Sequence, residues 1–310
     1  MISSRQLAGK RWFRAVADVL PDPVRNPIGW LQLNLHRQRA LRLLRRPLPV
    51  QRLPHGLPGE LIVSLTSYPA RFATLHLTLR SLLAQSVRPD RLLLWIAHGD
   101  ANLLPKAVRA LEEQGLSIRL CDDLRSYKKL VPALDAFPNA FIVTADDDLY
   151  YPPPWLAGII EGVDVAVPAI LARRAHRLKL TPDGRIKPYL SWDWDVQDDR
   201  AYGPSPDIMP TSGAGALYPP HSLHPIVTDR SVFKRLCPDS DDLWFYWCAR
   251  MAGTPLRKVG GKLRLIGWAG SQQSSLWENN RRGGNDRMIR RLEAEFGIGV
   301  LGLDGKPLGS

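Results

Sequence analysis

The sequence predicts an α/β protein whose core is a doubly wound, mainly parallel sheet with helices on both faces. Short, almost uninterrupted apolar stretches are typical of parallel strands that are buried on both sides. Segments with apolar residues at helical spacing alternate with these stretches, as a parallel sheet requires. Hydrophobic residues make up 45% of the 310 residues, which is enough for a sizeable core. The length allows one large α/β domain or two domains.

Strands and helices alternate regularly between residues 61 and 145. The expected strands are Leu61–Thr66, Leu92–Ala97, Ser117–Cys121 and Ala140–Ala145. The expected helices between them are Arg71–Gln85, Leu104–Gln114 and Tyr127–Ala136. In sheets of this kind ligands bind beyond the carboxyl ends of the strands. We therefore expect the chemistry directly after residues 66, 97, 121 and 145.

The pattern is looser beyond residue 160. The expected elements are a strand at Val163–Ile170, a tight turn at Pro182–Gly184 between two short strands, a helix after Ser240, a strand at Leu263–Ile266 and a helix at Asp286–Phe296. A glycine-rich tail begins at Gly297, and we expect it to be flexible.

Most of the excess positive charge lies in a leading extension. Residues 1–56 contain eleven of the 42 Lys and Arg residues and two of the 30 Asp and Glu residues, so the rest of the chain is nearly neutral. We therefore expect no nucleic-acid partner, although the isoelectric point is about 9.9. Helices are expected at residues 3–20 and 28–46, followed by a proline-rich linker. Residues 5–46 fit either a basic helix on an anionic membrane surface or a solvated arm packed on the catalytic body or a partner protein.

The three cysteines, Cys121, Cys237 and Cys248, are odd in number and lack CxxC spacing. This pattern excludes a disulfide framework and a thiolate zinc site, and it fits a reducing compartment. No apolar run approaches the ~20 residues that a membrane span needs. Arg11 and Arg14 interrupt the apolar region that a signal peptide would need. We expect a cytoplasmic protein, with a peripheral position on the inner face of the membrane as the alternative.

Three adjacent carboxylates, Asp146, Asp147 and Asp148, directly follow the fourth expected strand. They repel one another, and strand packing does not require them, so a cation must offset their charge. A hard divalent ion such as Mg²⁺ or Mn²⁺, shared with substrate phosphates, is the economical cation. The alternative is an acidic loop that is merely solvated. The buried strand before the triplet and the aromatic and proline-rich turn after it favour the metal.

With this triplet the sequence resembles the nucleotide-sugar-dependent glycosyltransferases of the GT-A fold, particularly family-two-like bacterial enzymes. Their DXD-type acidic motif is matched by residues 146–148. Residues 64–71 run from the end of the first strand through the loop after it, and residues 122–129 follow the third strand, where such enzymes hold the nucleotide. Asp241-Asp242, followed by Arg250 and Gly253, is similar to the Glu-Asp motif of the family. The likeness covers about residues 60–296.

The resemblance implies a GT-A-type fold and a nucleoside diphosphate sugar as donor, with a UDP-sugar favoured. It implies a basic helical extension and linker at 1–56, a nucleotide-sugar-binding half at 57–160, an acceptor-binding half with a C-terminal lid at 161–296, and a flexible tail at 297–310. Two departures are visible. Ala145 stands where the longer acidic motif begins, and Asp241 replaces the usual Glu.

The resemblance also implies the roles of the site residues. Asp146 and Asp148 would hold Mn²⁺ or Mg²⁺, and Asp242 would be the catalytic base, with Asp241 orienting the acceptor or exchanging roles with it. The implied donor-binding residues are Thr66, Ser67, Tyr68, Arg71, Asp122, Lys128, Lys129, Asp147, Arg281 and Arg282. The last two arginines lie beside Gly283-Gly284 and would close over a bound diphosphate as a lid.

The predicted function is metal-dependent, inverting transfer of a sugar to a glycan or lipid-linked acceptor in the synthesis of surface polysaccharide or lipopolysaccharide. One alternative is a nucleotidyltransferase, which also uses a doubly wound sheet and metal-binding carboxylates but normally needs a glycine-rich basic loop after its first strand. The other is a catalytically inactive adaptor that binds membrane or nucleic acid through its basic segment. The P-loop and GxGxxG patterns of kinases and dehydrogenases are absent from the sequence.

Overall fold

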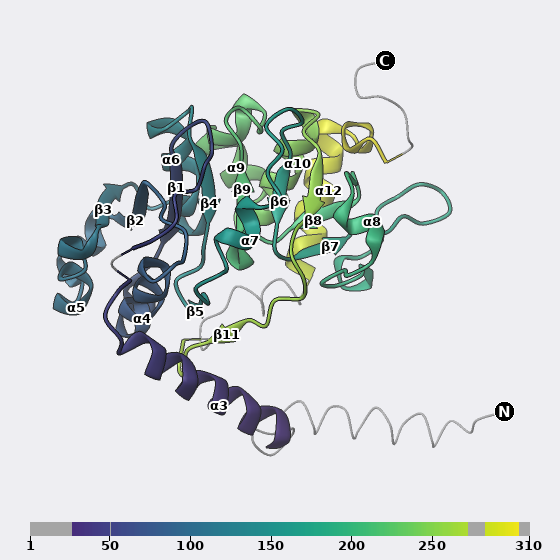
Figure 1. Ribbon diagram of the computed structural model, residues 1–310. Coiled ribbons are helices and arrows are strands. Elements are labelled where there is room, and N and C mark those ends of the chain that lie inside the picture. The colour runs from purple at the N-terminus through teal and green to yellow at the C-terminus, as the bar shows by residue number, and fades with distance from the viewer. Residues whose placement is uncertain (1–26, 50, 272–282, 304–310) are drawn as a thin grey trace, which may run out of the picture. The chain divides into compact units, whose positions relative to one another are not determined.

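A computed structural model describes residues 27–49, 51–271 and 283–303. The chain divides into two compact units, Met1–Pro47 and Leu48–Ser310. In the first unit the helix α3, Pro27–Leu44, confirms the helix expected at 28–46, and the helix expected at 3–20 lies outside the described residues (Figure 1). In the described ranges no helix has both the length and the apolar character needed to cross a membrane.

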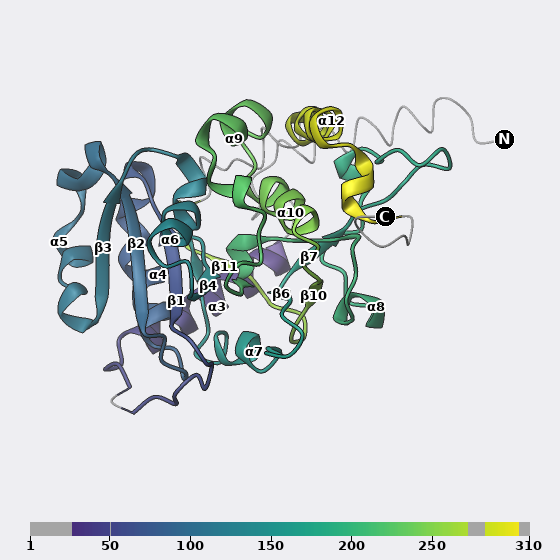
Figure 2. The same cartoon turned by 90° about the horizontal axis from the view of Figure 1, so that it is seen from above.

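A seven-stranded sheet in the order β10-β6-β9-β4-β1-β2-β3 forms the centre of the second unit, and its neighbours β4, β1, β2 and β3 lie side by side in Figure 2. Its strands are β1 Leu61–Thr66, β2 Arg91–Ala97, β3 Leu116–Cys121, β4 Phe141–Thr144, β6 Ile170–Ala172, β9 Ala216–Tyr218 and β10 Leu256–Lys258. Strand β9 is antiparallel to β4 and β6, and the other pairs are parallel. The predicted α/β fold with a mainly parallel sheet is therefore confirmed.

Two small antiparallel pairs accompany the central sheet. They are β5 Leu149–Tyr150 with β11 Ile266–Gly267, and β7 Ala175–Arg177 with β8 Ile208–Pro210. The described helices of this unit are α4 Phe72–Leu83, α5 Lys106–Arg109, α6 Val131–Ala136, α7 Ala157–Ile160, α8 Asp199–Tyr202, α9 Arg230–Leu236, α10 Asp241–Met251 and α12 Asn285–Phe296.

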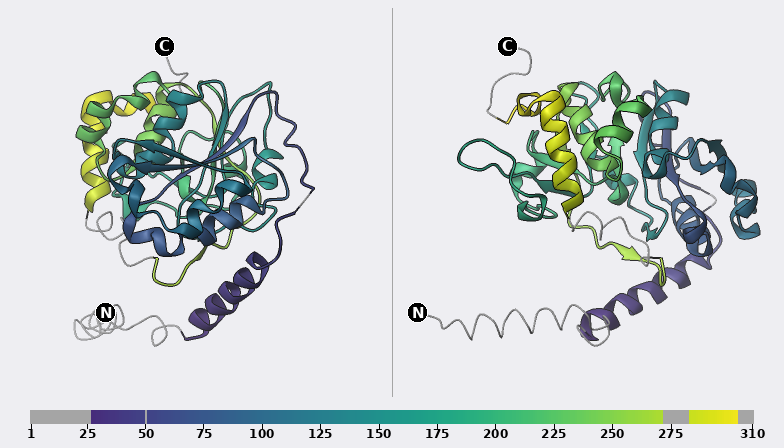
Figure 3. Two further views of the ribbon diagram at one scale, coloured as in Figure 1. Left: turned by 90° about the vertical axis from the view of Figure 1, so that its left-hand side faces the viewer. Right: turned by 180° about the vertical axis from the view of Figure 1, so that it is seen from behind.

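Helices cover both faces of the sheet, because alternate residues of each strand enter two different cores. In β1, Ile62 belongs to a core with α6, α9, α10 and α12, whereas Val63 and Leu65 belong to a core with α4, α5 and α7. Strands β1, β2 and β4 are therefore buried on both sides and need no polar residue at alternate positions. Helix α12 packs beside α10 (Figure 3), and its residue Leu292 is fully buried.

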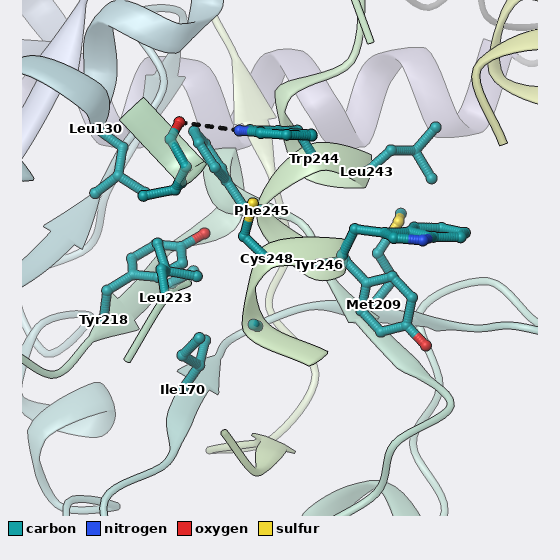
Figure 4. Close-up of a cluster of buried hydrophobic side chains, with 14 of the residues drawn as sticks. Leu130, Ile170, Met209, Tyr218, Leu223, Leu243, Trp244, Phe245, Tyr246 and Cys248 are labelled. Atoms are coloured by element: carbon teal, nitrogen blue, oxygen red, sulfur yellow. Dashed lines mark hydrogen bonds between the residues drawn. The ribbon is translucent and has the colours of Figure 1, made fainter. Parts of the chain in front are cut away.

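Helix α10 is the most thoroughly buried helix near the site. Figure 4 shows its aromatic residues packed among side chains from the sheet and neighbouring loops, and the Trp244 indole donates a hydrogen bond to the Val227 carbonyl at 3.0 Å. Tryptophan side chains can stack on the apolar faces of sugar rings, and the sequence offers Trp192, Trp194, Trp244 and Trp247 as candidates. Trp192, Trp244 and Trp247 are at most 3% exposed, so they belong to the core. The candidate Trp194 is partly buried against His176.

Two expected helices are shorter than the sequence pattern suggests. In place of Tyr127–Ala136 the chain forms a 3₁₀ helix at Arg125–Lys129 and then α6, which has a proline in its first turn. In place of Leu104–Gln114 it forms α5 and a 3₁₀ helix at Glu112–Gln114. A proline lacks the amide proton that a continuous helix would need, so α5 begins directly after Pro105 and α6 has Pro132 as its second residue.

Three predictions in the second half need correction. The strand expected at Val163–Ile170 begins only at Ile170, and the strand expected at Leu263–Ile266 is Ile266–Gly267. The flexible tail expected from Gly297 instead begins with a 3₁₀ helix, Ile298–Leu301. Leu301 is fully buried, and its carbonyl accepts a hydrogen bond from Arg250 at 3.0 Å, which explains the order of this segment.

Candidate active site

The candidate site lies where the sheet brings distant segments together. Strand β4 ends at Thr144, so the aspartate triplet projects beyond the carboxyl edge of the parallel strands. Strand β9 runs the other way and pairs Ala216 with Thr144, so the residues just before it reach the same edge. There the Thr144 hydroxyl donates a hydrogen bond to the Ser212 carbonyl at 2.9 Å. The topology therefore places Ser212 beside the triplet.

One group of charges, which we call the Lys129 cluster, consists of Lys129, Asp146, Ser212, Asp241 and Asp242. The Lys129 ammonium nitrogen lies 2.6 Å from Asp146 Oδ1, 3.3 Å from Asp241 Oδ2 and 3.2 Å from the Ser212 hydroxyl. Burial opposes the charge of Lys129, but the charges of Asp146, Asp241 and Asp242 outweigh burial and raise its pKa well above the ordinary value. Lys129 therefore stays protonated.

Within this cluster Ser212 orients Asp242. The Ser212 amide donates to Asp242 Oδ1 at 2.9 Å, and its hydroxyl donates to the same oxygen at 2.5 Å. Burial, and then the neighbouring charge of Asp241, raises the pKa of Asp242 to about 6. A carboxylate with a pKa close to neutral, fixed by two donors, is suited to accept a proton from a bound hydroxyl.

The second group, the Arg71 cluster, consists of Arg71, Ser67, Asp147 and Asp148. The Arg71 guanidinium donates a short hydrogen bond to Asp148 and lies 3.5 Å from Asp147 Oδ1. The Ser67 hydroxyl donates to Asp147 Oδ2 at 2.5 Å. Burial raises the pKa of Asp147 to about 7, although the Ser67 hydrogen bond works against this shift. This cluster is buried and nearly neutral.

Tyr151 and Gly213 determine where the Asp146 carboxylate lies. The Tyr151 hydroxyl donates to the Gly213 carbonyl at 2.5 Å and accepts the Asp146 amide at 2.7 Å. A Cβ atom on Gly213 would lie 1.7 Å from Asp146 Oδ2, so only glycine allows this approach. From the sequence, the small residues at 213–220 fit either a wall that a sugar ring can approach closely or a tight strand. The stretch contains β9, and its Gly213 gives room to a carboxylate.

The sequence did not single out Ser212 or Tyr151. Ser212 directly precedes the small-residue stretch, and Tyr151 belongs to the aromatic and proline-rich turn after the triplet. Closeness to these two motifs is the only sign in the sequence that points to Ser212 and Tyr151. Their hydrogen-bond partners lie 30 residues away at Asp242 and 62 residues away at Gly213, so only the fold reveals their roles.

The predicted metal ligands Asp146 and Asp148 do not fit one shared divalent ion. Asp146 faces the ammonium group of Lys129, and Asp148 faces the guanidinium of Arg71. Nor does any group of three His, Cys, Asp or Glu side chains suited to a metal ion occur in the described parts of the chain. The positive charge that the sequence assigns to a metal is therefore supplied here by a lysine and an arginine.

Several predicted donor-binding residues have protein partners. Lys128 pairs with Asp123 at 2.7 Å, Asp122 pairs with Arg230, and the Thr66 hydroxyl donates to the Trp95 carbonyl at 2.8 Å.

Tyr68 is 37% exposed, and its ring centre lies 5.9 Å from the Arg71 guanidinium carbon. Arg281 and Arg282 lie outside the described residues. The donor-binding roles of these residues therefore stay predictions.

No protein-family model matches the sequence, and no curated protein matches it. Among solved structures, a mannosyltransferase from Pyrobaculum calidifontis in complex with GDP-Man and Mn²⁺ is similar, with a TM-score of 0.49 and 13% identity over 88% of this chain and 76% of that chain. A 4-diphosphocytidyl-2C-methyl-D-erythritol synthase from Anaerococcus prevotii has a TM-score of 0.43 and 12% identity over 74% of this chain and 96% of that chain.

An inositol-1-phosphate CTP transferase from T. maritima is also similar, with a TM-score of 0.39 and 12% identity over 76% of this chain and 96% of that chain. These proteins are a glycosyltransferase and enzymes that use cytidine nucleotides. At such identities and TM-scores the likeness concerns the overall α/β fold alone. It does not separate glycosyl transfer from nucleotidyl transfer.

Proposed function

We propose that the chain transfers a sugar from a nucleoside diphosphate sugar to an acceptor hydroxyl, with Asp242 as the base. The observation that supports this most is the position of Asp242 in the Lys129 cluster. Its carboxylate is oriented by Ser212, has a pKa raised to about 6, and belongs to the same cluster as Asp146 at the carboxyl edge of the sheet. Ligands bind at such an edge in doubly wound sheets.

In the proposed reaction the acceptor oxygen attacks the anomeric carbon of the donor. The acceptor O–H bond breaks and its proton passes to Asp242, while the bond from the anomeric carbon to the diphosphate oxygen breaks and the diphosphate leaves with the electron pair. Attack from the side opposite the leaving group inverts the anomeric configuration. Asp241, held 3.3 Å from the Lys129 nitrogen, keeps the adjoining turn of α10 in place.

Finer features belong to the same proposal. The donor would bind to the 57–160 half and the acceptor to the 161–296 half, with Arg281 and Arg282 closing over the diphosphate. A UDP-sugar donor, a glycan or lipid-linked acceptor and a role in surface polysaccharide synthesis are the specific form that we propose. The basic segment at 5–46 would place a cytoplasmic enzyme at an anionic membrane surface, where lipid-linked acceptors lie.

The loop after β1 favours sugar transfer over nucleotidyl transfer. A nucleotidyltransferase would need a glycine-rich basic loop there to surround a triphosphate with backbone amides. The loop contains no glycine between Thr66 and Arg71. Arg71 is only 9% exposed, and its guanidinium is paired with Asp148. Sugar transfer is therefore the function that we propose, and nucleotidyl transfer is the alternative that the experiment tests.

The test is a panel of nucleoside diphosphate sugars and nucleoside triphosphates, screened for thermal stabilisation and for hydrolysis of the donor. A ligand that binds only the folded state raises the melting temperature. We expect a nucleoside diphosphate sugar to stabilise the chain, and Asp242→Asn to lower its turnover by about 10²–10⁴-fold while leaving the stabilisation in place.

Asp239→Asn is the matched control, because Asp239 lies just before the start of α10 but pairs with Arg125 at 2.5 Å, outside the Lys129 cluster. It should keep its turnover. Stabilisation by a nucleoside triphosphate, with release of pyrophosphate when a sugar phosphate is added, would replace the proposal with nucleotidyl transfer. Deletion of residues 1–56 should leave donor hydrolysis intact, whereas an adaptor would lose its binding activity.

A further inference from the structure

Lys129 occupies the position in which the sequence predicts a divalent ion. Its ammonium nitrogen is surrounded by carboxylate oxygens of Asp146 and Asp241 at 2.6 and 3.3 Å. A divalent ion would need oxygen ligands at about 2.0–2.6 Å, so it would compete with this ammonium group for the same oxygens and be repelled by its charge. Asp146 Oδ2 packs closely against Gly213, although the Asp146 side chain is 38% exposed, so the competing charge of Lys129 is the main obstacle to a metal ion.

Lys129 is also fixed at its backbone. The Ser64 hydroxyl donates to the Lys129 carbonyl at 2.6 Å, and the Trp95 indole donates to the Ser64 hydroxyl at 3.1 Å. Two residues earlier, the Tyr127 ring stacks on Phe233 with their centres 4.1 Å apart. The lysine is 6% exposed. A surface lysine can leave its partner at little cost in free energy, whereas Lys129 is buried and held in place.

Asp148 is balanced in a similar way on the other side of the triplet. The Arg71 guanidinium donates to it and is itself 9% exposed. A planar guanidinium holds a carboxylate firmly and keeps its charge at all ordinary pH values. Both aspartates that the sequence assigns to a metal thus have a buried protein cation.

We propose that Lys129, together with Arg71, is the resident cation of this carboxylate edge, and that the site holds no divalent ion of its own. The inference rests on the proposed function for one consequence, which is that donor turnover does not require added divalent ions. Its central claim concerns the cation alone and is tested without any donor.

The probe is Mn²⁺ alone, added to the full chain at neutral pH, with bound metal measured by calorimetry and by the electron paramagnetic resonance of free Mn²⁺. We expect the unmodified chain to bind Mn²⁺ no more tightly than about 1 mM. Lys129→Met removes the competing charge and leaves three carboxylates facing one another. It should therefore bind Mn²⁺ at least about tenfold more tightly.

Lys128→Met is the matched control, because Lys128 is equally buried but pairs with Asp123, an exposed carboxylate outside the cluster. It should bind Mn²⁺ as weakly as the unmodified chain. Circular dichroism checks that each variant is folded. If Lys129→Met does not fold, the unmodified chain and Asp146→Asn decide the question by themselves.

Stoichiometric binding of Mn²⁺ by the unmodified chain in the micromolar range, lost in Asp146→Asn, would overturn the inference. Failure of the proposed function has a different signature, namely no stabilisation by any nucleoside diphosphate sugar. If a donor is found, its turnover should survive treatment with a chelator. Turnover abolished by the chelator and restored by Mn²⁺ would contradict the consequence even if Mn²⁺ alone did not bind.

Discussion

The two charge clusters around the aspartate triplet differ in where their residues come from and in how they carry charge. The Arg71 cluster is built within the first half of the sheet, from residues 67 to 148. The Lys129 cluster joins that half to Ser212 and to the start of α10. In the first, Asp147 has a pKa of about 7 and is close to neutral, whereas the second places three carboxylates around one lysine. A local, nearly neutral cluster supports the loop after β1, and a long-range cluster with surplus carboxylates is where we expect chemistry.

Removing the cation of each cluster should have the largest effect and tests the difference between the two clusters most directly. Lys129→Met leaves three carboxylates without a counter-charge, and it should lower the free energy of unfolding by about 3–5 kcal/mol. Arg71→Met should cost less, about 1–3 kcal/mol, because Asp147 can take up a proton near its pKa of about 7 and leave one charge on Asp148. Denaturant unfolding at neutral pH measures both values.

The control for this pair is Lys128→Met. Its partner Asp123 is 64% exposed and is solvated after the substitution, so the cost should stay below about 1 kcal/mol. Equal costs for Lys129→Met and Arg71→Met would remove the contrast between the two clusters.

Much of the fold could be predicted because burial fixes the pattern of apolar residues. The bounds of β1 are as expected, and α4 begins one residue later and ends two residues earlier than the expected helix. A tight strand was only one of two interpretations of the small-residue stretch that contains β9, since three residues carry no periodicity. The break between the 3₁₀ helix at Arg125–Lys129 and α6 follows from Pro132, which the helical spacing of apolar residues conceals.

The site could be predicted only in part, for a different reason. The acidic runs at 146–148 and 241–242 are conspicuous because nothing in packing requires them. Lys129 was also singled out, but with a substrate diphosphate as its expected partner. Residue types show which charges exist, whereas their pairing depends on β9 bringing Ser212 to the end of β4. That contact is a property of the sheet order, which the sequence pattern does not specify.

The pH dependence separates the two clusters by function. Asp242 and Asp147 both have a folded pKa above the ordinary 3.8, at about 6 and about 7. The unfolded chain therefore releases these protons first as the pH rises, so each residue lowers the free energy of unfolding between about pH 4 and its folded pKa. Between pH 4 and 6 the free energy of unfolding should therefore fall by roughly 2 kcal/mol less in Asp242→Asn than in the unmodified chain. Asp147→Asn should likewise weaken the fall in the free energy of unfolding, but over a range that extends to pH 7.

Of these two aspartates, only Asp242 should affect the pH dependence of kcat/KM. A base must be unprotonated to accept the acceptor proton, so kcat/KM should rise with pH to a plateau above about pH 6. Asp147→Asn should keep that rising limb, and Asp242→Asn should abolish it together with most of the rate. A limb that persists in Asp242→Asn would assign the base to another group.

The smallest expected effect sharpens the comparison by moving one carboxylate without removing a charge. Gly213→Ala would place a Cβ 1.7 Å from Asp146 Oδ2, and the carboxylate must turn away from Lys129 to make room. Because the side chain of Asp146 is 38% exposed, the displaced carboxylate is solvated, and we expect a loss of only about 1 kcal/mol in denaturant unfolding. Gly99→Ala is the control, since a Cβ atom added at Gly99 would meet no other atom within 4 Å, and it should leave stability unchanged.

The Arg71 cluster should also be unaffected, so the contribution of Asp147 to the pH dependence of unfolding should persist in Gly213→Ala. If that contribution changed, the two clusters would be coupled through the triplet, and their separate roles would have to be abandoned.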